Sequence, residues 1–305
     1  MASRFYLPET VSRMAVETRG SSGRAWIRRL PRLVEECAET WSLSVEPPFA
    51  HLSYNYVVPV TRSGVPLVLK VCFPEEDFRN EAMALQYFQG RGCARLVEVD
   101  LKRGALLIER LRPGLSLGAV TDDERATSIA AQVMRRLWYP LRSVGPYPSV
   151  ADWVKGMATR SPVLTKENPA FPARWIRHAL VLYDELASKS DELVILHGDL
   201  HHANILSAER EGWLAIDPKG LIGERACEAG PLLINALPEK HEVALIRPIV
   251  SRRVRQLAEE LQLDHERIRA WAIIRSVLAA YWCLESFGRG WNWAIACAEA
   301  LLDSS

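Results

Sequence analysis

One stretch, residues 193–219, constrains this chain of 305 residues more than any other. Four apolar residues lead into His197, Gly198 and Asp199; Asn204 follows, and a second apolar run ends at Asp217. Short apolar runs bounded by turn residues are typical of buried strands. We therefore expect two short strands to bring three oxygen-bearing side chains to one place.

These three side chains suit phosphoryl transfer. A carboxylate at the end of a strand can orient a substrate hydroxyl and accept its proton. An amide and a second carboxylate are oxygen ligands that suit Mg²⁺ bridging nucleotide phosphates. Asp-x4-Asn, then a strand and a further Asp, is the pattern of the kinase catalytic loop and metal site. The alternative is a hairpin whose Asp and Asn only make the turn, but a plain turn needs neither the flanking His-Gly nor the second Asp.

The residues around this pattern resemble one kinase family. HGDLHHANIL followed by WLAIDPKGLIGE is similar to the aminoglycoside phosphotransferase branch of the protein-kinase-like superfamily, and within it to the streptomycin 6-phosphotransferase and hydroxyurea phosphotransferase family. The tail Asp-Pro-x-Gly-Leu-x-Gly-Glu is distinctive of that family, whereas typical kinases carry Asp-Phe-Gly. The likeness extends from the early RAWIRRL segment to at least Glu228.

The resemblance implies a fold and site roles. Asp199 would be the base that positions the acceptor hydroxyl, Asn204 and Asp217 the Mg²⁺ ligands, and His197 a structural member of the loop. The implied fold class is α+β, a bilobal protein-kinase-like fold with a small antiparallel-sheet lobe and a larger, mainly helical lobe. We expect an N-terminal lobe over residues 1–111, with a leading helix and five strands, and a C-terminal lobe over 112–305 that holds the catalytic loop and acceptor pocket.

A buried charge pair is expected in the first lobe. Lys70 follows the apolar strand 65–69, and a buried lysine costs several kcal/mol unless it is paired. Glu81 lies on the apolar face of a predicted helix over 77–89, beside Phe78 and Leu85. The pair would hold the ammonium against the α- and β-phosphates of ATP. The alternative is a lysine that extends to solvent and a solvent-facing glutamate.

Further nucleotide contacts follow only from similarity to kinases. No G-x-G-x-x-G is present, so the strand and turn around residues 53–56 would contact phosphate through backbone N–H groups and the Ser53 hydroxyl. Adenine would pair with the main chain at Glu109 and Leu111, before the Pro113-Gly114 break. Other strands are expected at 57–60, 65–71, 96–99 and 105–111.

The helices expected elsewhere frame the acceptor site. Residues 1–24 are polar and predict a loop, followed by a helix over 24–41 that Pro31 breaks or restarts. Capping signals at Thr121 and Ser149 predict two helices, a third spans 169–189, and a fourth spans 264–287 before a final helix to about 302.

The acceptor is a small-molecule hydroxyl. The resemblance suggests streptomycin, at its 6-position, another aminoglycoside, or hydroxyurea. Candidate substrate contacts are Glu228, Glu285 and Trp291, with Glu224 as a further carboxylate for a guanidinium group. For Glu228 the alternative is bracing of the catalytic loop. A housekeeping metabolite kinase and a nucleotide-binding pseudokinase are the competing functions, and the second conflicts with the presence of all five core kinase residues.

Composition excludes several other classes. The balance of 38 basic and 37 acidic residues provides no overall attraction to nucleic acid or anionic membrane. The six cysteines form no Cys-x-x-Cys pair and have no regular spacing, so they predict buried thiols. His197, His201 and His202 do not predict a zinc site, because their segment lacks a third ligand at zinc spacing. No signal-peptide core or run of eighteen apolar residues is present, so a cytoplasmic monomer or homodimer is expected.

Overall fold

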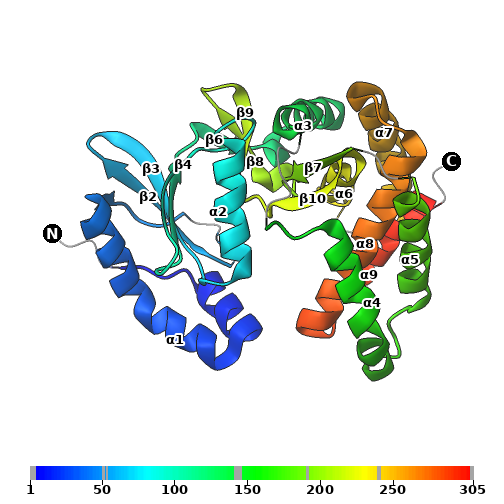
Figure 1. Ribbon diagram of the computed structural model, residues 1–305, viewed down its shortest axis with the longest axis horizontal. Helices are drawn as coiled ribbons and strands as arrows, with labels where there is room; N and C mark the ends of the chain where they lie inside the picture. The colour runs from blue at the N-terminus through cyan, green and yellow to red at the C-terminus, as the bar shows by residue number, and fades with distance from the viewer. Residues whose placement is uncertain are drawn as a thin grey trace. The chain divides into compact units, whose positions relative to one another are not determined.

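The computed structural model describes residues 5–49, 52, 54–140, 146–189, 192–238 and 242–302. The chain divides into two compact units, Met1–Gly114 and Leu115–Ser305 (Figure 1). An antiparallel sheet forms the centre of the first unit, and helices dominate the second. The predicted α+β fold class is therefore confirmed.

The first unit is built on a five-stranded antiparallel sheet in the order β1-β2-β3-β5-β4. Its strands are β1 Ser44–Val45, β2 Tyr56–Arg62, β3 Val65–Val71, β4 Leu96–Asp100 and β5 Ala105–Glu109. The number of strands agrees with the sequence prediction, but the edge strand is a two-residue segment before position 50. The strand and turn predicted around 53–56 agree with the residues described there, because Tyr54 and Asn55 form a bend and β2 begins at Tyr56.

Helix α1 (Glu9–Trp41) differs from its prediction in where it starts and in where it is interrupted. It starts fifteen residues before position 24, and its one non-helical residue is Gly20 rather than Pro31. Buried Val11 and Leu30 belong to the same core cluster, so tertiary burial stabilises helix on either side of these residues. The expected loop over 1–24 was wrong for residues 9–24, which are helical apart from Gly20, whereas residues 5–8 lie outside regular secondary structure.

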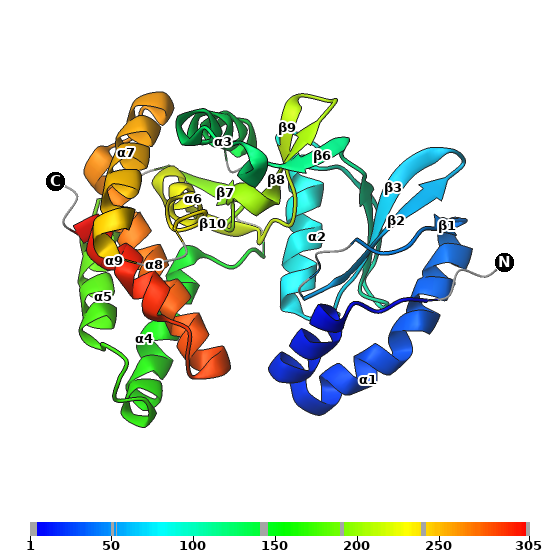
Figure 2. The ribbon, with the colours of Figure 1, turned by 180° about the vertical axis from the view of Figure 1, so that it is seen from behind.

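The two faces of the sheet meet different helices. Strand side chains alternate between faces, and Leu69 and Val71 of β3 join the core cluster that α1 covers with Trp26. Lys70, between them, is placed on the other face, toward α2 (Glu76–Phe88). Figures 1 and 2 show α1 and α2 on opposite sides of the sheet.

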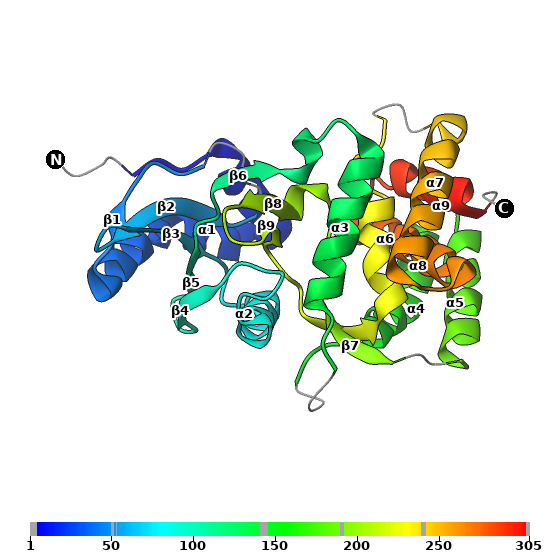
Figure 3. The ribbon, with the colours of Figure 1, turned by 90° about the horizontal axis from the view of Figure 1, so that it is seen from above.

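The second unit contains seven described α-helices, and α8 is the one on which most of the others pack (Figure 3). They are α3 Asp123–Leu137, α4 Val150–Glu167, α5 Arg174–Ala187, α6 Ala229–Leu233, α7 Val243–Leu261, α8 His265–Phe287 and α9 Asn292–Leu302. Helices α4, α5, α6, α7 and α9 all pack against α8. Among the described residues, no helix is both long and apolar enough to cross a membrane.

Helix caps explain where several of these helices begin. Ser149 and Asp152 form the predicted capping box of α4, in which each side chain bonds the other residue's backbone N–H. The cap of α3 is Asp122 rather than Thr121. Helix α5 begins at Arg174, five residues later than predicted, because Pro172 disfavours helical geometry at the preceding residue.

Short strands position the loop of the catalytic motif. The sequence predicted two strands here, but β7 (Leu193–Leu196) pairs with β10 (Leu221–Glu224), and β8 (Ile205–Ala208) pairs with β9 (Gly212–Ala215). Strand β6 (Pro113–Ser116) lies beside β8. Two of these four-residue strands, β8 and β10, were missed because so few residues show no clear periodicity.

Five of the six cysteines are buried, and Cys283 is partly exposed. The five agree with the prediction of buried thiols that pack as small apolar side chains.

Candidate active site

The loop after β7 turns sharply at Gly198. This residue has φ +80°, and a Cβ atom placed there would lie 2.7 Å from Leu221 Cδ1 on the paired strand. Only glycine meets both conditions without strain. The turn leads the chain out of the buried strand to Asp199, whose side chain is 26% exposed.

Glu228 holds this turn from the next segment. It closes the short 3₁₀ helix Arg225–Glu228 and is fully buried. Its carboxylate accepts the backbone N–H of His197 at 2.6 Å and that of Gly198 at 2.9 Å. Burial raises the pKa of Glu228 to about 7, although these two hydrogen bonds favour the charged form and so act to lower it. The geometry favours the bracing role that the sequence left open, over a substrate contact.

His197 joins the two halves of the motif. One ring nitrogen, Nε2, lies 2.7 Å from the carbonyl oxygen of Ile216, and Nδ1 lies 3.3 Å from the backbone nitrogen of Asp199. The ring must donate through Nε2 and accept through Nδ1, so the neutral form satisfies both partners. Burial lowers the pKa of His197 to about 4. These contacts fit the structural role expected for this residue.

The backbone brings Asn204, in the loop after β7, next to the segment after β9 that carries Asp217. The Asn204 amide nitrogen donates to the carbonyl oxygen of Asp199 at 3.0 Å, and the Asn204 carbonyl accepts from Ile216 N at 2.9 Å. Asp217 follows directly, in the left-handed region at φ 59°. The predicted gathering of three oxygen-bearing residues is therefore present.

The donor set fits a Mg²⁺ ion that takes some of its ligands from the protein and the others from a nucleotide. Because Asn204 Nδ2 is tied to Asp199, its amide oxygen is the atom available for a metal. Within the described ranges, no group of three or more His, Cys, Asp or Glu residues could hold a metal by itself. Asn204 and Asp217 would thus need phosphate oxygens to complete the coordination, and their metal role stays a prediction.

Asp199 has a partner that the sequence did not reveal. Arg275 of α8 places Nη2 3.0 Å from Asp199 Oδ1. Burial alone would raise the pKa of Asp199, but the charges of Arg275 and then His201 outweigh it and lower the pKa below its ordinary value. The carboxylate is therefore ionised at neutral pH. The available signal was an arginine between the buried apolar residues Ile274 and Val277 of a long helix.

The predicted charge pair of the first unit is confirmed. Lys70 Nζ lies 2.7 Å from Glu81 Oε1, and the two residues are 2% and 7% exposed. Both are thus almost fully removed from water. The contact of Lys70 with nucleotide phosphates stays a prediction.

The remaining nucleotide candidates have less support. The backbone N–H of Glu109 donates to the Arg95 carbonyl at 2.9 Å, so this donor is already used within the unit. Leu111 is buried, at 9% exposure. Ser53 lies outside the described residues. Adenine contacts at Glu109 and Leu111 stay predictions.

The candidate substrate residues each bind their own neighbours. Glu285 accepts the Tyr281 hydroxyl at 2.9 Å and forms an ion pair with Arg160. Trp291 packs edge-to-face with Phe171, with ring centroids 5.2 Å apart. Their contacts with an acceptor stay predictions.

Glu224 has a structural environment. Its buried carboxylate accepts Arg267 Nε at 2.5 Å and the indole N–H of Trp271. These donors hold the start of α8 against β10, so Glu224 is engaged inside the protein rather than presented to a guanidinium ligand.

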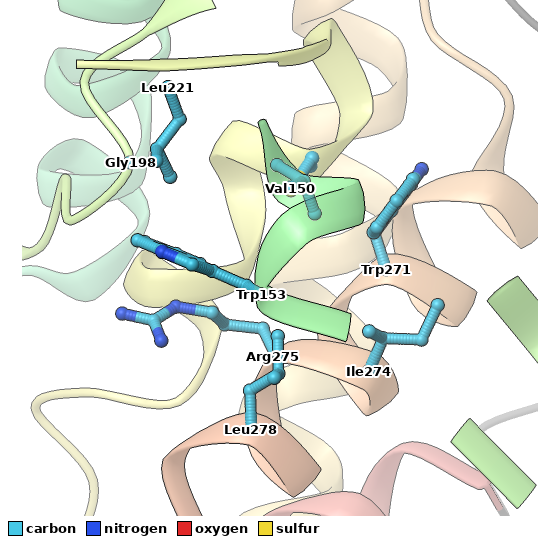
Figure 4. A pocket seen from close by; sticks show the side chains of 9 residues that line it. Val150, Trp153, Gly198, Leu221, Trp271, Ile274, Arg275 and Leu278 are labelled. Carbon is cyan, nitrogen blue, oxygen red and sulfur yellow. The ribbon is translucent and has the colours of Figure 1, made fainter. Parts of the chain in front are cut away.

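A small pocket in the second unit is lined in part by Gly198 and Arg275 (Figure 4). It is mostly apolar and is lined by Val150, Trp153, Gly198, Leu221, Cys227, Trp271, Ile274, Arg275 and Leu278. Helices α4 and α8 contribute most of its wall. Its volume, about 10 Å³, has room for about one water molecule, so this pocket as it stands does not hold an acceptor.

The comparison with known proteins agrees with this geometry. Residues 40–286 match the family described as aminoglycoside/hydroxyurea antibiotic resistance kinase. The chain is 30% identical over 303 residues to streptomycin 6-kinase of Streptomyces griseus, covering 93% of this chain and 92% of that protein. It is 34% identical over 283 residues to hydroxyurea phosphotransferase of Kitasatospora aureofaciens, covering 92% and 80%.

Solved structures share the fold at low sequence identity. The aminoglycoside phosphotransferase APH(4)-Ia, in a ternary complex with ADP and hygromycin B, has a TM-score of 0.62 and 16% identity, covering 89% of this chain and 98% of that one. Choline kinase LicA from Streptococcus pneumoniae has a TM-score of 0.65 and 12% identity, covering 90% and 98%. With the family match spanning most of the sequence, the chain belongs to the aminoglycoside/hydroxyurea antibiotic resistance kinase family and is a phosphotransferase.

Proposed function

We propose that this protein transfers the γ-phosphoryl group of ATP, with Mg²⁺, to a hydroxyl group of streptomycin, at the 6-position, or of hydroxyurea. The observation that supports this most is the convergence of Asp199, Asn204 and Asp217, from two hydrogen-bonded loops, at one site. Family membership supports the reaction class, and the names of the relatives support the two acceptors.

Asp199 is assigned to the acceptor hydroxyl. Phosphoryl transfer has a loose transition state, so catalysis depends mainly on positioning and on charge neutralisation. A carboxylate with a lowered pKa can orient the hydroxyl without being a strong base. Glu228 and His197 would act through this carboxylate, because they hold the backbone on which it stands.

Residues are also assigned to the metal and to the nucleotide phosphates. Asn204 and Asp217 would hold Mg²⁺, and Lys70, kept in place by Glu81, would bind the α- and β-phosphates. The chemistry that the metal supplies when bound is neutralisation of phosphate charge.

The test is ADP production with ATP and Mg²⁺ across an acceptor panel. The panel contains streptomycin, other aminoglycosides, hydroxyurea, common sugars and amino alcohols, and mass spectrometry identifies the phosphorylated product. A signal that depends on streptomycin or hydroxyurea supports the proposal. A signal from sugars or amino alcohols alone would instead identify a metabolite kinase, and silence with ATP still bound would favour a pseudokinase.

A further inference from the structure

Within the described part of the chain, the Asp199 carboxylate is hydrogen-bonded at one oxygen only. Arg275 of α8 places Nη2 3.0 Å from Oδ1. The charged neighbour of Oδ2 is His201, whose Nε2 lies 3.8 Å away, beyond hydrogen-bond distance. The Asp199 side chain is 26% exposed. One oxygen of the carboxylate is therefore bound inside the protein, and the other is available to a ligand.

The Arg275 side chain is itself held in place. It is only 11% exposed. Its Cζ atom lies 4.7 Å from the ring centroid of Trp282 and 5.6 Å from that of Trp153, and Figure 4 shows Arg275 beside Trp153. A planar guanidinium group stacked on aromatic rings has few orientations open to it. Arg275 can therefore act as a rigid support for the carboxylate.

The same part of the structure also supports the backbone before Asp199. Glu228 accepts two backbone N–H groups of the turn that leads to Asp199. Gly230 follows two residues later in α6 and packs against the stem of Arg275. A Cβ atom on Gly230 would lie 2.8 Å from Arg275 Cβ and 3.0 Å from Cγ. One short segment therefore contacts both the loop that carries the carboxylate and the arginine that binds it.

We propose that Arg275 is a positioning residue for phosphoryl transfer: by binding Oδ1 of Asp199, it fixes the plane of the carboxylate and presents Oδ2 to the acceptor hydroxyl. The hydroxyl proton passes to Oδ2, the hydroxyl oxygen bonds to the γ-phosphorus, and the bond from that phosphorus to ADP breaks. Arg275 does not contact the acceptor. The inference rests on the proposed function and adds to it the orientation of the base.

Orientation has a large effect in this kind of reaction. Phosphoryl transfer has a loose transition state, so its rate depends mainly on positioning. The last torsion of an aspartate side chain is broad, so a carboxylate without Arg275 would present Oδ2 to the hydroxyl only part of the time. A misplacement of about 1 Å can lower a rate about 100-fold. Loss of Arg275 should therefore lower kcat and leave substrate affinity nearly unchanged.

The test separates kcat from KM. ADP production is measured with the acceptor that gives the largest wild-type signal in the panel. Arg275→Met should lower kcat by about 100-fold and change KM for ATP and for the acceptor by less than about threefold. Arg275→Lys keeps one donor for Oδ1 and should lie between. Arg269→Met, on the same helix and paired with Glu266, is the control and should match wild type.

A second variant moves the arginine without removing it. Gly230→Ala adds a methyl group where Arg275 Cβ and Cγ lie, so it should lower kcat by about 10-fold. Gly156→Ala of α4 is the matched control, because its Cβ would meet no atom within 4 Å, and it should have the wild-type rate. Gly230→Ala should not lower the kcat of Arg275→Met further, because both changes act through the same contact.

A stability cycle tests the contact without turnover. Urea denaturation of Asp199→Asn, Arg275→Met and the double variant should show a coupling of at least about fivefold in the unfolding equilibrium constant, because the two side chains are bonded. Circular dichroism establishes that each variant is folded. If Arg275→Met does not fold, Arg275→Lys and Gly230→Ala decide the question.

Several outcomes would overturn the inference. They are an unchanged kcat in folded Arg275→Met, a defect confined to KM, or the absence of coupling between Asp199 and Arg275. Wild-type protein that is silent with every acceptor would refute the proposed function, and the stability cycle would then decide whether Arg275 holds Asp199. Acceptor-dependent ADP production that Arg275→Met retains at the wild-type kcat would refute this inference alone.

Discussion

Replacement of Lys70 tests whether the buried pair of the first unit serves the nucleotide or only the fold. Lys70→Met removes the cation from 2.7 Å of Glu81, a residue only 7% exposed. Breaking a buried ion pair on one side costs about 3–5 kcal/mol, because the remaining charge is desolvated without compensation. We expect the free energy of unfolding to fall by that amount.

The double variant separates the two roles. Replacing a buried pair by apolar residues of similar size is often neutral or stabilising, so Lys70→Met with Glu81→Leu should recover most of the lost stability. The coupling energy between the two sites should therefore be about 3 kcal/mol. Nucleotide affinity should not recover, because the ammonium that would bind the phosphates is still absent.

Urea denaturation of the full chain gives the stabilities, and titration with a fluorescent ATP analogue gives the affinities. Lys102→Met, at an exposed turn of the same unit, is the control and should change neither quantity. A double variant that regains nucleotide affinity together with stability would refute the phosphate-binding role of Lys70. A Lys70→Met protein as stable as wild type would refute the energetic argument.

Three further changes test the loop and the large unit. The pKa of Glu228 is raised from 4.5 to about 7, so between these pH values the folded state keeps a proton that the unfolded chain releases. The free energy of unfolding of the wild type should therefore fall by about 3 kcal/mol from pH 4.5 to 7, compared with that of Glu228→Gln. Urea titrations at both pH values measure this change. Gly198→Ala should lower both melting temperature and turnover, since φ +80° and the Leu221 contact exclude a Cβ; a normal rate would contradict this. Asp264→Ala removes the α8 cap and should cost about 1 kcal/mol in urea denaturation, so an unchanged midpoint would count against it.

Features encoded by neighbouring residues were predictable from the sequence. The motif around Asp199 combines apolar runs with polar residues at fixed spacing, and the structure brings those residues together from two adjacent loops. Lys70 and Glu81 each stand out as a charge on an apolar face, and they do form a pair. In both cases local pattern and buried charge were sufficient.

Features that depend on distant segments were not predictable. Arg275 lies 76 residues from Asp199 in the sequence, and only the packing of α8 brings them together. The start of α1 was missed because its apolar positions Val11 and Ala15 are sparse among polar residues, although they are buried in the sheet core. Strand β1 has two residues, too few for any periodic signal.

The central claim, that Asp199 orients the acceptor hydroxyl, is tested most directly by Asp199→Asn. The amide keeps the size of the side chain and loses its charge, so ATP affinity should stay near that of wild type. Acceptor-dependent ADP production should fall by about 100- to 10,000-fold, the usual contribution of a positioned general base. An Asp199→Asn protein that binds ATP and turns over at the wild-type rate would contradict the account.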